Sequence, residues 1–334
     1  MTRVLVTGAN GFIGRALCRE LRSAGFEVTG AVRDKTGRDE PGRDEPGRDD
    51  AGFDAVAIGA LGPDTDWQEA LRGAEAVVHL AGHAHATDEA GAGALALYRR
   101  INVEGTRRLA EATGESGARR FIFLSSVKVH GEASGASPFT ERDPPAPEDP
   151  YGISKWEAEQ ALARATERAD LVPVILRAPL VYGPGVKGNF RSLLRLCDGP
   201  LPLPFGAVTN RRSLIYLANL TAAIRECITN AGAAGKTFLL RDGEDISTTE
   251  LIRRLRAALG RPARLISVPP SSLRRLAGII GRKGVAARLL DSLTVDDGLI
   301  RSSLGWSPPH GLDDGLRSTA EWFKAPGTAR RGAA

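Results

Sequence analysis

The stretch "VLVTGANGFIG", Val4–Gly14, decides the fold class. Its apolar run predicts a buried strand, and Gly8, Gly11 and Gly14 follow where a helical period begins. Glycine permits a tight turn and a close approach of backbone to a pyrophosphate, whose charge then lies at the positive N-terminus of a helix. Such turns also occur without a ligand. A second apolar run, "EVTGAVR", follows at the interval expected of a βαβ unit, and together these features predict a dinucleotide site.

The first half of the chain alternates two kinds of segment. The apolar runs are "RVLVTG", "EVTGAVR", "DAVAIG", "AEAVVHLAG", "RRFIFLSS" and "LVPVILRA", and the segments of helical period are "FIGRALCRELRSAG", "DTDWQEALRG", "LYRRINVEGTRRLAEATGESG" and "SKWEAEQALARATERA". This alternation predicts an α/β protein with a Rossmann-type, doubly wound parallel sheet over residues 1–178. Residues 179–325 are expected to form mainly a smaller, mixed α/β substrate-binding lobe, and residues 326–334 a flexible tail. Residues 37–50, "GRDEPGRDEPGRDD", repeat a unit without apolar side chains and are predicted to be a disordered insertion.

Composition excludes several classes of function. Apolar residues make up 42% and charged residues 25% of the 334-residue chain, and the formal net charge of +5 is spread along the sequence. Without a basic stripe and interleaved aromatic residues, nucleic acid is not an expected partner. No apolar run approaches the roughly 18 residues of a membrane span, so membrane insertion is not expected. Three distant cysteines without a CxxC pair predict neither disulfides nor a zinc site, and they favour a cytoplasmic location.

The spacing GxxGxxG, with "HLA" in "VVHLAG" and "NVEGT" after it, resembles the extended short-chain dehydrogenase/reductase family of nucleotide-sugar enzymes. The resemblance implies a set of cofactor contacts. They are Gly8, Gly11, Phe12, Ile13, Gly14, Arg33, Leu80, Ala81, Gly82, Tyr151, Lys155 and Pro179. In this family the end of the second strand selects between NAD and NADP. Arg33 at that position favours NADP(H), since a guanidinium pairs well with a phosphate, whereas Asp34 beside it would suit NAD.

The same resemblance places a catalytic group after the fifth apolar run. Ser126 matches the family's catalytic serine, Tyr151 and Lys155 match its YxxxK motif, and Asn102 helps to order the active-site hydrogen bonds. Reduction of a carbonyl requires a proton donor, and a phenol beside positive charge can serve. Each residue alone also has an ordinary explanation, as a turn serine, a helix-start aromatic or a solvated lysine. Their order behind the glycine turn favours catalysis.

The second half carries the expected substrate contacts. "VILRAPLVYGPGVKGNF" resembles the family segment that meets the nicotinamide, with Ala178 in place of the usual proline. The resemblance implies that Asn189 contacts a substrate phosphate and that Arg212 pairs with the pyrophosphate, although Arg211 could exchange roles with it. Ser126 and Lys128 complete the expected substrate contacts. His83 and His85 have no companion carboxylate or cysteine set, so we expect a loop near the active site and no metal.

The motifs look most like bacterial reductases of UDP-4-keto-6-deoxy-N-acetylhexosamines, which supply sugars for surface polysaccharides. The prediction is therefore an NAD(P)H-dependent reduction at sugar C4. The alternative is a UDP-hexose 4-epimerase with tightly bound NAD, because the catalytic residues are shared. A third possibility, a non-catalytic dinucleotide sensor, would normally lack the tyrosine or the lysine. The resemblance also implies a UDP-sugar substrate and a homodimer formed through the helices in "LYRRINVEGTRRLAEAT" and "SKWEAEQALARAT".

Overall fold

The larger sheet of the computed structural model confirms the predicted parallel architecture. The structure describes residues 1–34, 53–84, 92–167 and 169–325, so the predictions for residues 37–50, His85 and residues 326–334 fall outside the described residues. All seven strands of the larger sheet are parallel. Their order is β3 (Asp54–Ala57), β2 (Glu27–Val32), β1 (Arg3–Thr7), β4 (Ala76–His79), β5 (Arg120–Ser126), β6 (Val172–Ala178) and β9 (Thr237–Leu239).

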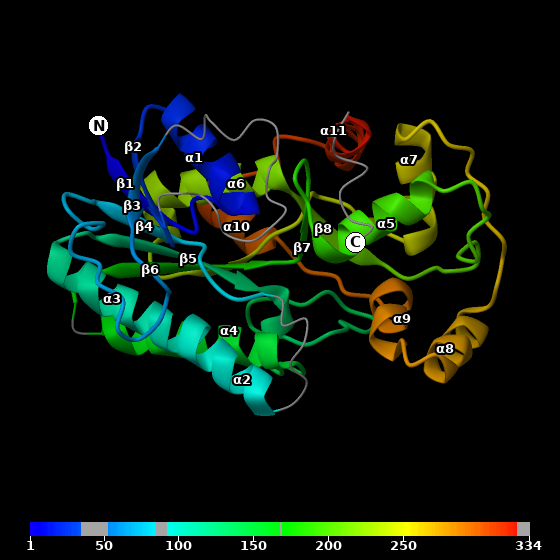
Figure 1. The fold of residues 1–334 in the computed structure, drawn as a ribbon, viewed down its shortest axis with the longest axis horizontal. Helices are drawn as coiled ribbons and strands as arrows, with labels where there is room; N and C mark the ends of the chain where they lie inside the picture. Colours follow the sequence, from blue (N-terminus) through cyan, green and yellow to red (C-terminus); the bar gives the residue numbers. More distant parts are fainter. Residues whose placement is uncertain (35–52, 85–91, 168, 326–334) are drawn as a thin grey trace.

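Helices cover both faces of this sheet (Figure 1). One face carries α1 (Phe12–Ser23), α6 (Leu217–Thr229) and α10 (Gly298–Leu304), and the other carries α2 (Ala92–Tyr98), α3 (Gly105–Ser116) and α4 (Pro150–Thr166). Apolar residues spaced three or four apart turn one side of each helix toward the strands. Leu17 and Leu21 of α1 are buried in one core cluster, and Leu109 of α3 and Leu162 of α4 in the other. The central strands are buried on both faces, as their nearly continuous apolar runs predict.

The smaller lobe combines a short mixed sheet with five helices. Strands β7 (Leu180–Tyr182) and β8 (Arg212–Tyr216) are parallel, and β10 (Asp245–Ile246) is antiparallel to β8. The helices are α5 (Gly188–Asp198), α7 (Thr248–Ala258), α8 (Pro270–Ile279), α9 (Lys283–Leu290) and α11 (Leu312–Lys324). A separate core cluster joins α5, α7 and α11 to this sheet. The larger sheet nevertheless includes β9 from the part of the chain beyond Ala178, and α6 and α10 from that part pack on one of its faces.

Two segments differ from the predicted helices. Residues 64–73, "DTDWQEALRG", form turns, because polar side chains bind the local backbone and compete with helix formation. The Thr65 hydroxyl accepts from the Gly62 amide at 2.9 Å, and an Asp66 carboxylate oxygen accepts from the Gln68 amide at 3.0 Å. The expected single helix over 97–117 is instead α2, a π-helical segment η1 (Arg99–Glu104) and α3 in succession. Two short 3₁₀ turns, η2 (Val127–Val129) and η3 (Ala231–Ala233), complete the list of elements.

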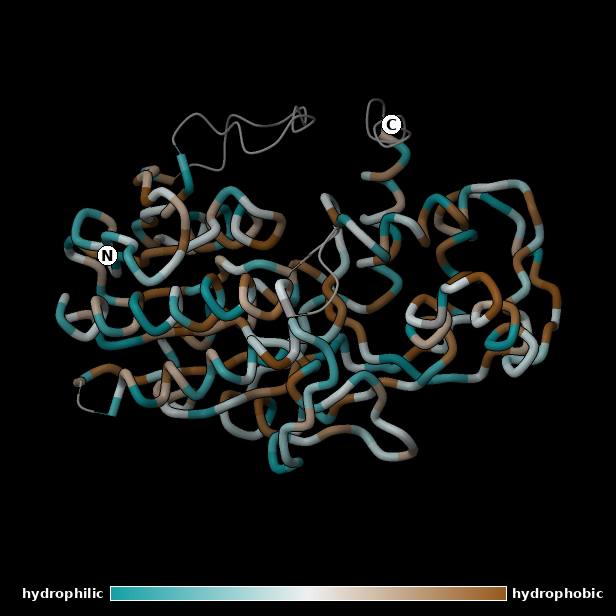
Figure 2. Tube along the Cα trace, turned by 60° about the horizontal axis from the view of Figure 1, so that its bottom comes forward, coloured by the Kyte–Doolittle hydropathy of each residue, from teal (hydrophilic) through white to brown (hydrophobic). Residues whose placement is uncertain are grey.

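The candidate site lies at the carboxyl ends of the strands. The sheet register aligns Thr7 at the end of β1 with His79 at the end of β4, and Ser126 at the end of β5 with Ala178 at the end of β6. In a parallel sheet these ends share one edge, and that is where ligands bind in doubly wound folds. Both Figure 1 and Figure 2 show the smaller lobe beyond this edge of the sheet.

Candidate active site

The turn between β1 and α1 brings backbone close together at positions that have no room for a side chain. Gly8 has a φ of +66°, a left-handed conformation that favours glycine, and a Cβ there would lie 3.0 Å from the Ala81 amide nitrogen. A Cβ on Gly14 would lie 2.1 Å from the Gly8 carbonyl oxygen, and the Gly11 amide donates to that same oxygen at 2.9 Å. These glycines allow the N-terminus of α1 to close tightly on the turn. The cradle therefore fits a dinucleotide pyrophosphate held by backbone amides.

Thr7 and His79 connect the glycine turn to the end of β4. The Thr7 hydroxyl oxygen accepts from the backbone amides of Leu80 at 3.2 Å and Ala81 at 3.1 Å, and it lies 2.7 Å from His79 Nδ1. Since this oxygen already accepts two bonds, the hydroxyl proton goes to Nδ1, and the imidazole carries its own proton on Nε2. Burial lowers the pKa of His79 to about 3. A neutral histidine therefore fixes the end of β4 beside the glycine turn.

Asn102 fixes the loop that follows β4. Its side-chain amide donates to the Ser154 hydroxyl at 2.9 Å and to the His83 carbonyl at 3.0 Å, while its carbonyl oxygen accepts from the His83 amide at 2.7 Å. A Cβ on Gly82 would lie 3.1 Å from that same oxygen. Asn102 lies within the π-helical segment, and such insertions often occur at functional sites. In this structure Asn102 ties the loop after β4 to α4.

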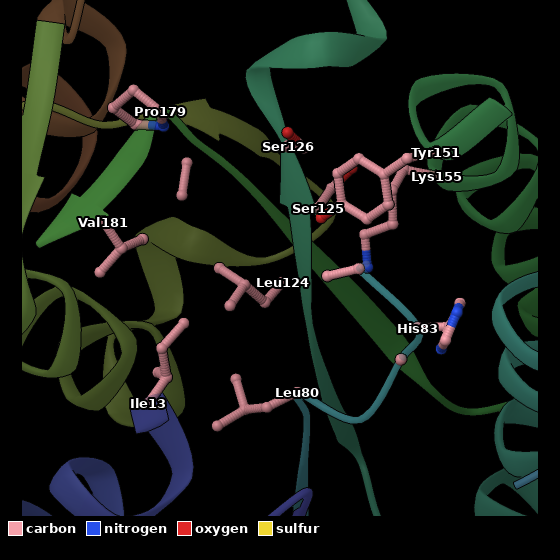
Figure 3. Close-up of a pocket in the computed structure, with 13 residues that line it drawn as sticks. Ile13, Leu80, His83, Leu124, Ser125, Ser126, Tyr151, Lys155, Pro179 and Val181 are labelled. Carbon is pink, nitrogen blue, oxygen red and sulfur yellow. The ribbon is translucent and has the colours of Figure 1, made fainter. Parts of the chain in front are cut away.

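Residues from α1, from the carboxyl ends of β4, β5 and β6, from β7 and from α4 enclose one pocket (Figure 3). It is lined by Ile13, Leu80, Gly82, His83, Ala84, Leu124, Ser125, Ser126, Tyr151, Lys155, Ala178, Pro179 and Val181. Tyr151, Lys155 and His83 lie on one side, with Ile13 and Leu80 across from them, and Ser126 lies at the end of β5 (Figure 3). The structure thus brings the predicted serine, tyrosine and lysine together with predicted cofactor contacts.

The surroundings of the pocket shift the pKa values of Tyr151 and Lys155 in opposite directions. Burial, together with the nearby Asp149 carboxylate, raises the pKa of Tyr151 to about 12, and a hydrogen bond with Ser126 acts in the opposite direction. Burial lowers the pKa of Lys155 to about 8, against the opposing effect of Glu159. The Lys155 ammonium lies 4.3 Å from the centre of the Phe123 ring. Tyr151 is therefore a neutral phenol at neutral pH, and Lys155 loses its proton only a little above neutral pH. Added positive charge from a cofactor would lower the pKa of the phenol.

A buried ion pair behind the pocket is absent from the sequence-based prediction. Arg177 donates to the Glu159 carboxylate through Nη2 at 2.6 Å and through Nε at 3.1 Å, and the Ser125 hydroxyl donates to the same carboxylate. Arg177 Nη1 also lies 2.9 Å from His130 Nε2, which accepts because burial and the guanidinium lower the histidine pKa to about 4. Glu159 is one helical turn beyond Lys155. In the sequence, the arginine within the otherwise apolar run "VPVILRA" was the signal that could have predicted this ion pair.

Of the predicted substrate contacts, Ser126 lines this pocket, whereas Lys128, Asn189 and Arg212 are not among its lining residues. Lys128 donates to Glu132 and to Asp149, each at 2.6 Å, so its ammonium is held between two carboxylates. Arg212, at the start of β8, donates to the Asp291 carbonyl oxygen at 3.1 Å, and burial lowers its pKa while Glu132 raises it. Glu132 therefore raises the pKa of both Lys128 and Arg212. Their substrate roles remain predictions.

Four further predicted residues occupy different places. Asn189 is exposed in the first turn of α5, and Arg33 is exposed directly after β2. Arg211 is exposed and forms an ion pair with Asp245 at 3.0 Å, whereas Arg212 is half-buried at the start of β8. Phe12 packs against the core cluster of the smaller lobe, and a Cβ on Gly185 would lie 3.4 Å from its ring. Phe12 thus connects the glycine turn to the smaller lobe.

The cysteines and His83 can be placed in the described portion of the chain. Cys18, Cys197 and Cys227 are free and buried. Among the described residues, no group of three or more histidine, cysteine, aspartate or glutamate side chains could hold a metal ion. His83 packs against Tyr98, with ring centres 5.2 Å apart. His85 is outside the described residues, so the expectation of no metal there stays a prediction.

Comparisons with known proteins agree with this geometry. The model of the NAD dependent epimerase/dehydratase family matches residues 4–240. A UDP-glucose 4-epimerase of Vibrio cholerae is 39% identical over 323 residues, which are 96% of this chain and 95% of that protein. N-acetyl-alpha-D-glucosaminyl-diphospho-ditrans,octacis-undecaprenol 4-epimerase of Escherichia coli O157:H7 is 27% identical over 332 residues, 96% of this chain and 94% of that protein. The solved structure of MoeE5 in complex with UDP-glucose and NAD is 28% identical, with a TM-score of 0.73, and the match covers 96% of this chain and 98% of that one.

The Rossmann-type sheet with its serine, tyrosine and lysine pocket defines the class, an extended short-chain dehydrogenase/reductase. Within that class, the chain belongs to the NAD dependent epimerase/dehydratase family. Among the described helices, none combines the length and the apolar character needed to span a bilayer.

Proposed function

We propose that this protein is a UDP-hexose 4-epimerase that works with a resident NAD. The observation that carries the proposal is the pocket in which Ser126, Tyr151 and Lys155 meet at the strand ends beside the glycine cradle. The 39% identity to the Vibrio cholerae UDP-glucose 4-epimerase over 96% of the chain supports 4-epimerisation over the 4-keto reduction predicted from sequence. NAD in the MoeE5 complex supports NAD over NADP(H).

The backbone of the turn at Gly8, Gly11 and Gly14 would hold the pyrophosphate. Leu80, Ala81 and Pro179, with Lys155, would surround the nicotinamide half. When bound, the nicotinamide would accept a hydride from sugar C4 and return it to the opposite face of that carbon. The protein has to supply the proton transfers that accompany the hydride transfers.

Tyr151 would take the proton of the C4 hydroxyl and give it back after the sugar has turned over in the pocket. It can take that proton only as a phenolate, and its pKa of about 12 without ligand disfavours that form at neutral pH. The neutral phenol formed in this way can then return the proton. The Lys155 ammonium and the positive charge of the oxidised cofactor would lower that pKa, since opposite charge favours the ionised form. Ser126 would hold the C4 oxygen, and Asn102 would keep the loop after β4 in place.

The substrate would extend toward the smaller lobe. Arg212 remains our candidate for the pyrophosphate, because a guanidinium carries a permanent charge and a forked set of donors. Asn189 remains our candidate for contact with a substrate phosphate. Lys128 would have to leave Glu132 or Asp149 to reach a ligand. We also propose a homodimer through α3 and α4, and a cytoplasmic location in keeping with the three buried thiols.

The second candidate function is the reduction of a UDP-4-keto-6-deoxy-N-acetylhexosamine. One observation favours it: Arg33 is exposed at the end of β2, where a basic side chain suits the extra phosphate of NADP. A reductase would consume external NADPH at every turnover, whereas an epimerase would consume none.

One experiment separates the two reactions. Purified protein is denatured, and the released nucleotide is identified by chromatography. Native protein is then incubated with UDP-glucose or UDP-N-acetylglucosamine without added cofactor, and in parallel with NADPH and a UDP-4-keto-6-deoxy sugar. Released NAD with formation of the C4 epimer supports the epimerase. NADPH oxidation without epimerisation would reject it in favour of the reductase, and neither activity would reject both.

A further inference from the structure

A helical hairpin, α8 with α9, forms the outer end of the smaller lobe, away from the larger sheet (Figure 1). The two helices, residues 270–290, pack on each other and on the segment before β8. Leu273 and Ala277 of α8 meet Ala286 and Leu290 of α9 in a small core cluster. This inner side accounts for only part of the aliphatic residues in the hairpin.

The outer side of the hairpin exposes large aliphatic side chains. Leu276 is 56% exposed, Ile279 82% and Ile280 57%, and on α9 Val285 is 44% exposed. Leu276 and Ile279 are three residues apart on α8, a spacing that places side chains on one helix face, and Ile280 follows directly at the end of the helix. Figure 2 shows apolar stretches of chain at this end of the lobe. Clustered exposure of this kind marks an interaction site more often than scattered single residues do.

The hairpin is also strongly basic. Residues 270–290 include five arginine or lysine residues and no aspartate or glutamate, which equals the formal net charge of +5 of the whole chain. Arg275 and Arg282 are exposed. Arg274 forms an ion pair with Asp291, just beyond α9, at 2.6 Å. The apolar outer face therefore lies within a segment of concentrated positive charge.

We propose that the outer face of the α8–α9 hairpin docks on an anionic lipid surface. A bilayer interface offers an acyl boundary that buries leucine and isoleucine, and anionic headgroups beside it that attract arginine. A second copy of the chain is a poorer occupant, because pairing hairpin with hairpin would bring two segments of net positive charge together. The contact is peripheral and leaves the active-site pocket to its nucleotide ligands.

Flotation with lipid vesicles tests the proposal. Full-length protein is mixed with vesicles of phosphatidylcholine alone, or of phosphatidylcholine with phosphatidylglycerol, at low and high salt. We expect binding to the anionic vesicles that weakens with salt. Arg275→Glu/Arg282→Glu should weaken it more than about tenfold, since each cation near such a surface contributes on the order of 1 kcal/mol. Ile279→Asp/Ile280→Asp should abolish it.

Matched substitutions elsewhere control for surface charge and hydrophobicity. Leu299→Asp removes an aliphatic side chain that is 37% exposed on α10, and Arg22→Glu reverses an exposed charge in the last turn of α1. Both should bind vesicles as the unmodified protein does, and circular dichroism should show every variant folded. The proposal is overturned by equal binding to neutral vesicles, by no vesicle binding, or by control variants that lose as much as the hairpin variants. Hairpin variants that convert a dimer to a monomer in gel filtration would also overturn it, since a second copy would then be the occupant.

Discussion

Replacing Glu159 by glutamine removes one charge from the buried ion pair behind the active site. Glu159 and Arg177 have side chains that are 3% and 6% exposed, and the carboxylate accepts from Arg177 through both oxygens. The glutamine keeps the shape but leaves the guanidinium buried beside a neutral amide. Breaking a buried pair in this way costs about 3–5 kcal/mol of the free energy of unfolding.

An exposed ion pair provides the comparison for the loss of stability. Arg3 and Glu27 form an ion pair at 2.9 Å with side chains that are 44% and 47% exposed, so Glu27→Gln should cost less than about 1 kcal/mol. Urea unfolding at neutral pH measures both losses. The double variant Glu159→Leu/Arg177→Met removes both charges together and should lose less than the sum of its single variants. A loss for Glu159→Gln no larger than that for Glu27→Gln would refute the reasoning.

The same substitution should be visible in catalysis. Glu159 raises the pKa of Lys155 against the effect of burial, so its removal should lower that pKa further from about 8. A smaller fraction of Lys155 then carries charge at neutral pH, and the alkaline limit of activity should move to lower pH. A pH–rate profile measures this shift, and Glu27→Gln is the control that should leave the profile in place.

Three other substitutions or conditions have defined outcomes. Tyr151→Phe should lower kcat by about 10²–10⁴-fold, the range typical of a lost acid–base group, with bound nucleotide retained; single-turnover activity near the original level would reject its role. Gly14→Ala should abolish nucleotide retention, because the new Cβ would meet the Gly8 carbonyl oxygen at 2.1 Å, and chromatography of denatured protein checks this. His79 and His130 are buried with pKa values near 3 and 4, below the value of about 6.5 expected when unfolded. Protons then favour the unfolded state as the pH falls below 6.5. The free energy of unfolding should therefore drop by about 2 kcal/mol per histidine between pH 7 and pH 5, and urea unfolding at the two pH values measures this. Equal stability at both pH values would contradict the assignment of both histidines as buried and neutral.

The strands and the glycine turn were predictable because their causes are local. Apolar runs long enough for a buried strand, and glycines where Gly8 and Gly14 lack room for a Cβ, leave a direct trace in the sequence. The helix predicted at residues 64–73 was wrong for the opposite reason. Trp67 and Leu71 are buried, as their apolar spacing suggested, but they lie in a series of turns instead of a helix. The Thr65 and Asp66 side chains hold these turns through hydrogen bonds to the backbone.

The candidate site was predictable only in part. Ser126, Tyr151 and Lys155 carried a motif, and the structure brings them to one pocket. The supporting groups come from residues far apart in sequence, such as Ser125, Glu159 and Arg177, whose contacts depend on the register of β5 with β6 and on the rotation of α4. The π-helical turn around Asn102 also left no trace, because a one-residue widening of a helix hardly changes its apolar period.

The return of the chain to the larger sheet after Ala178 limits how this protein can be divided. β9 completes the hydrogen bonding of β6, and α6 packs on α1 in the same core cluster. A fragment that ended at residue 178 would expose the edge of β6 and the apolar side of α1, and an open edge of this kind invites aggregation. Exchange of substrate lobes between relatives would therefore need several junctions that leave β9, α6 and α10 with the nucleotide-binding part.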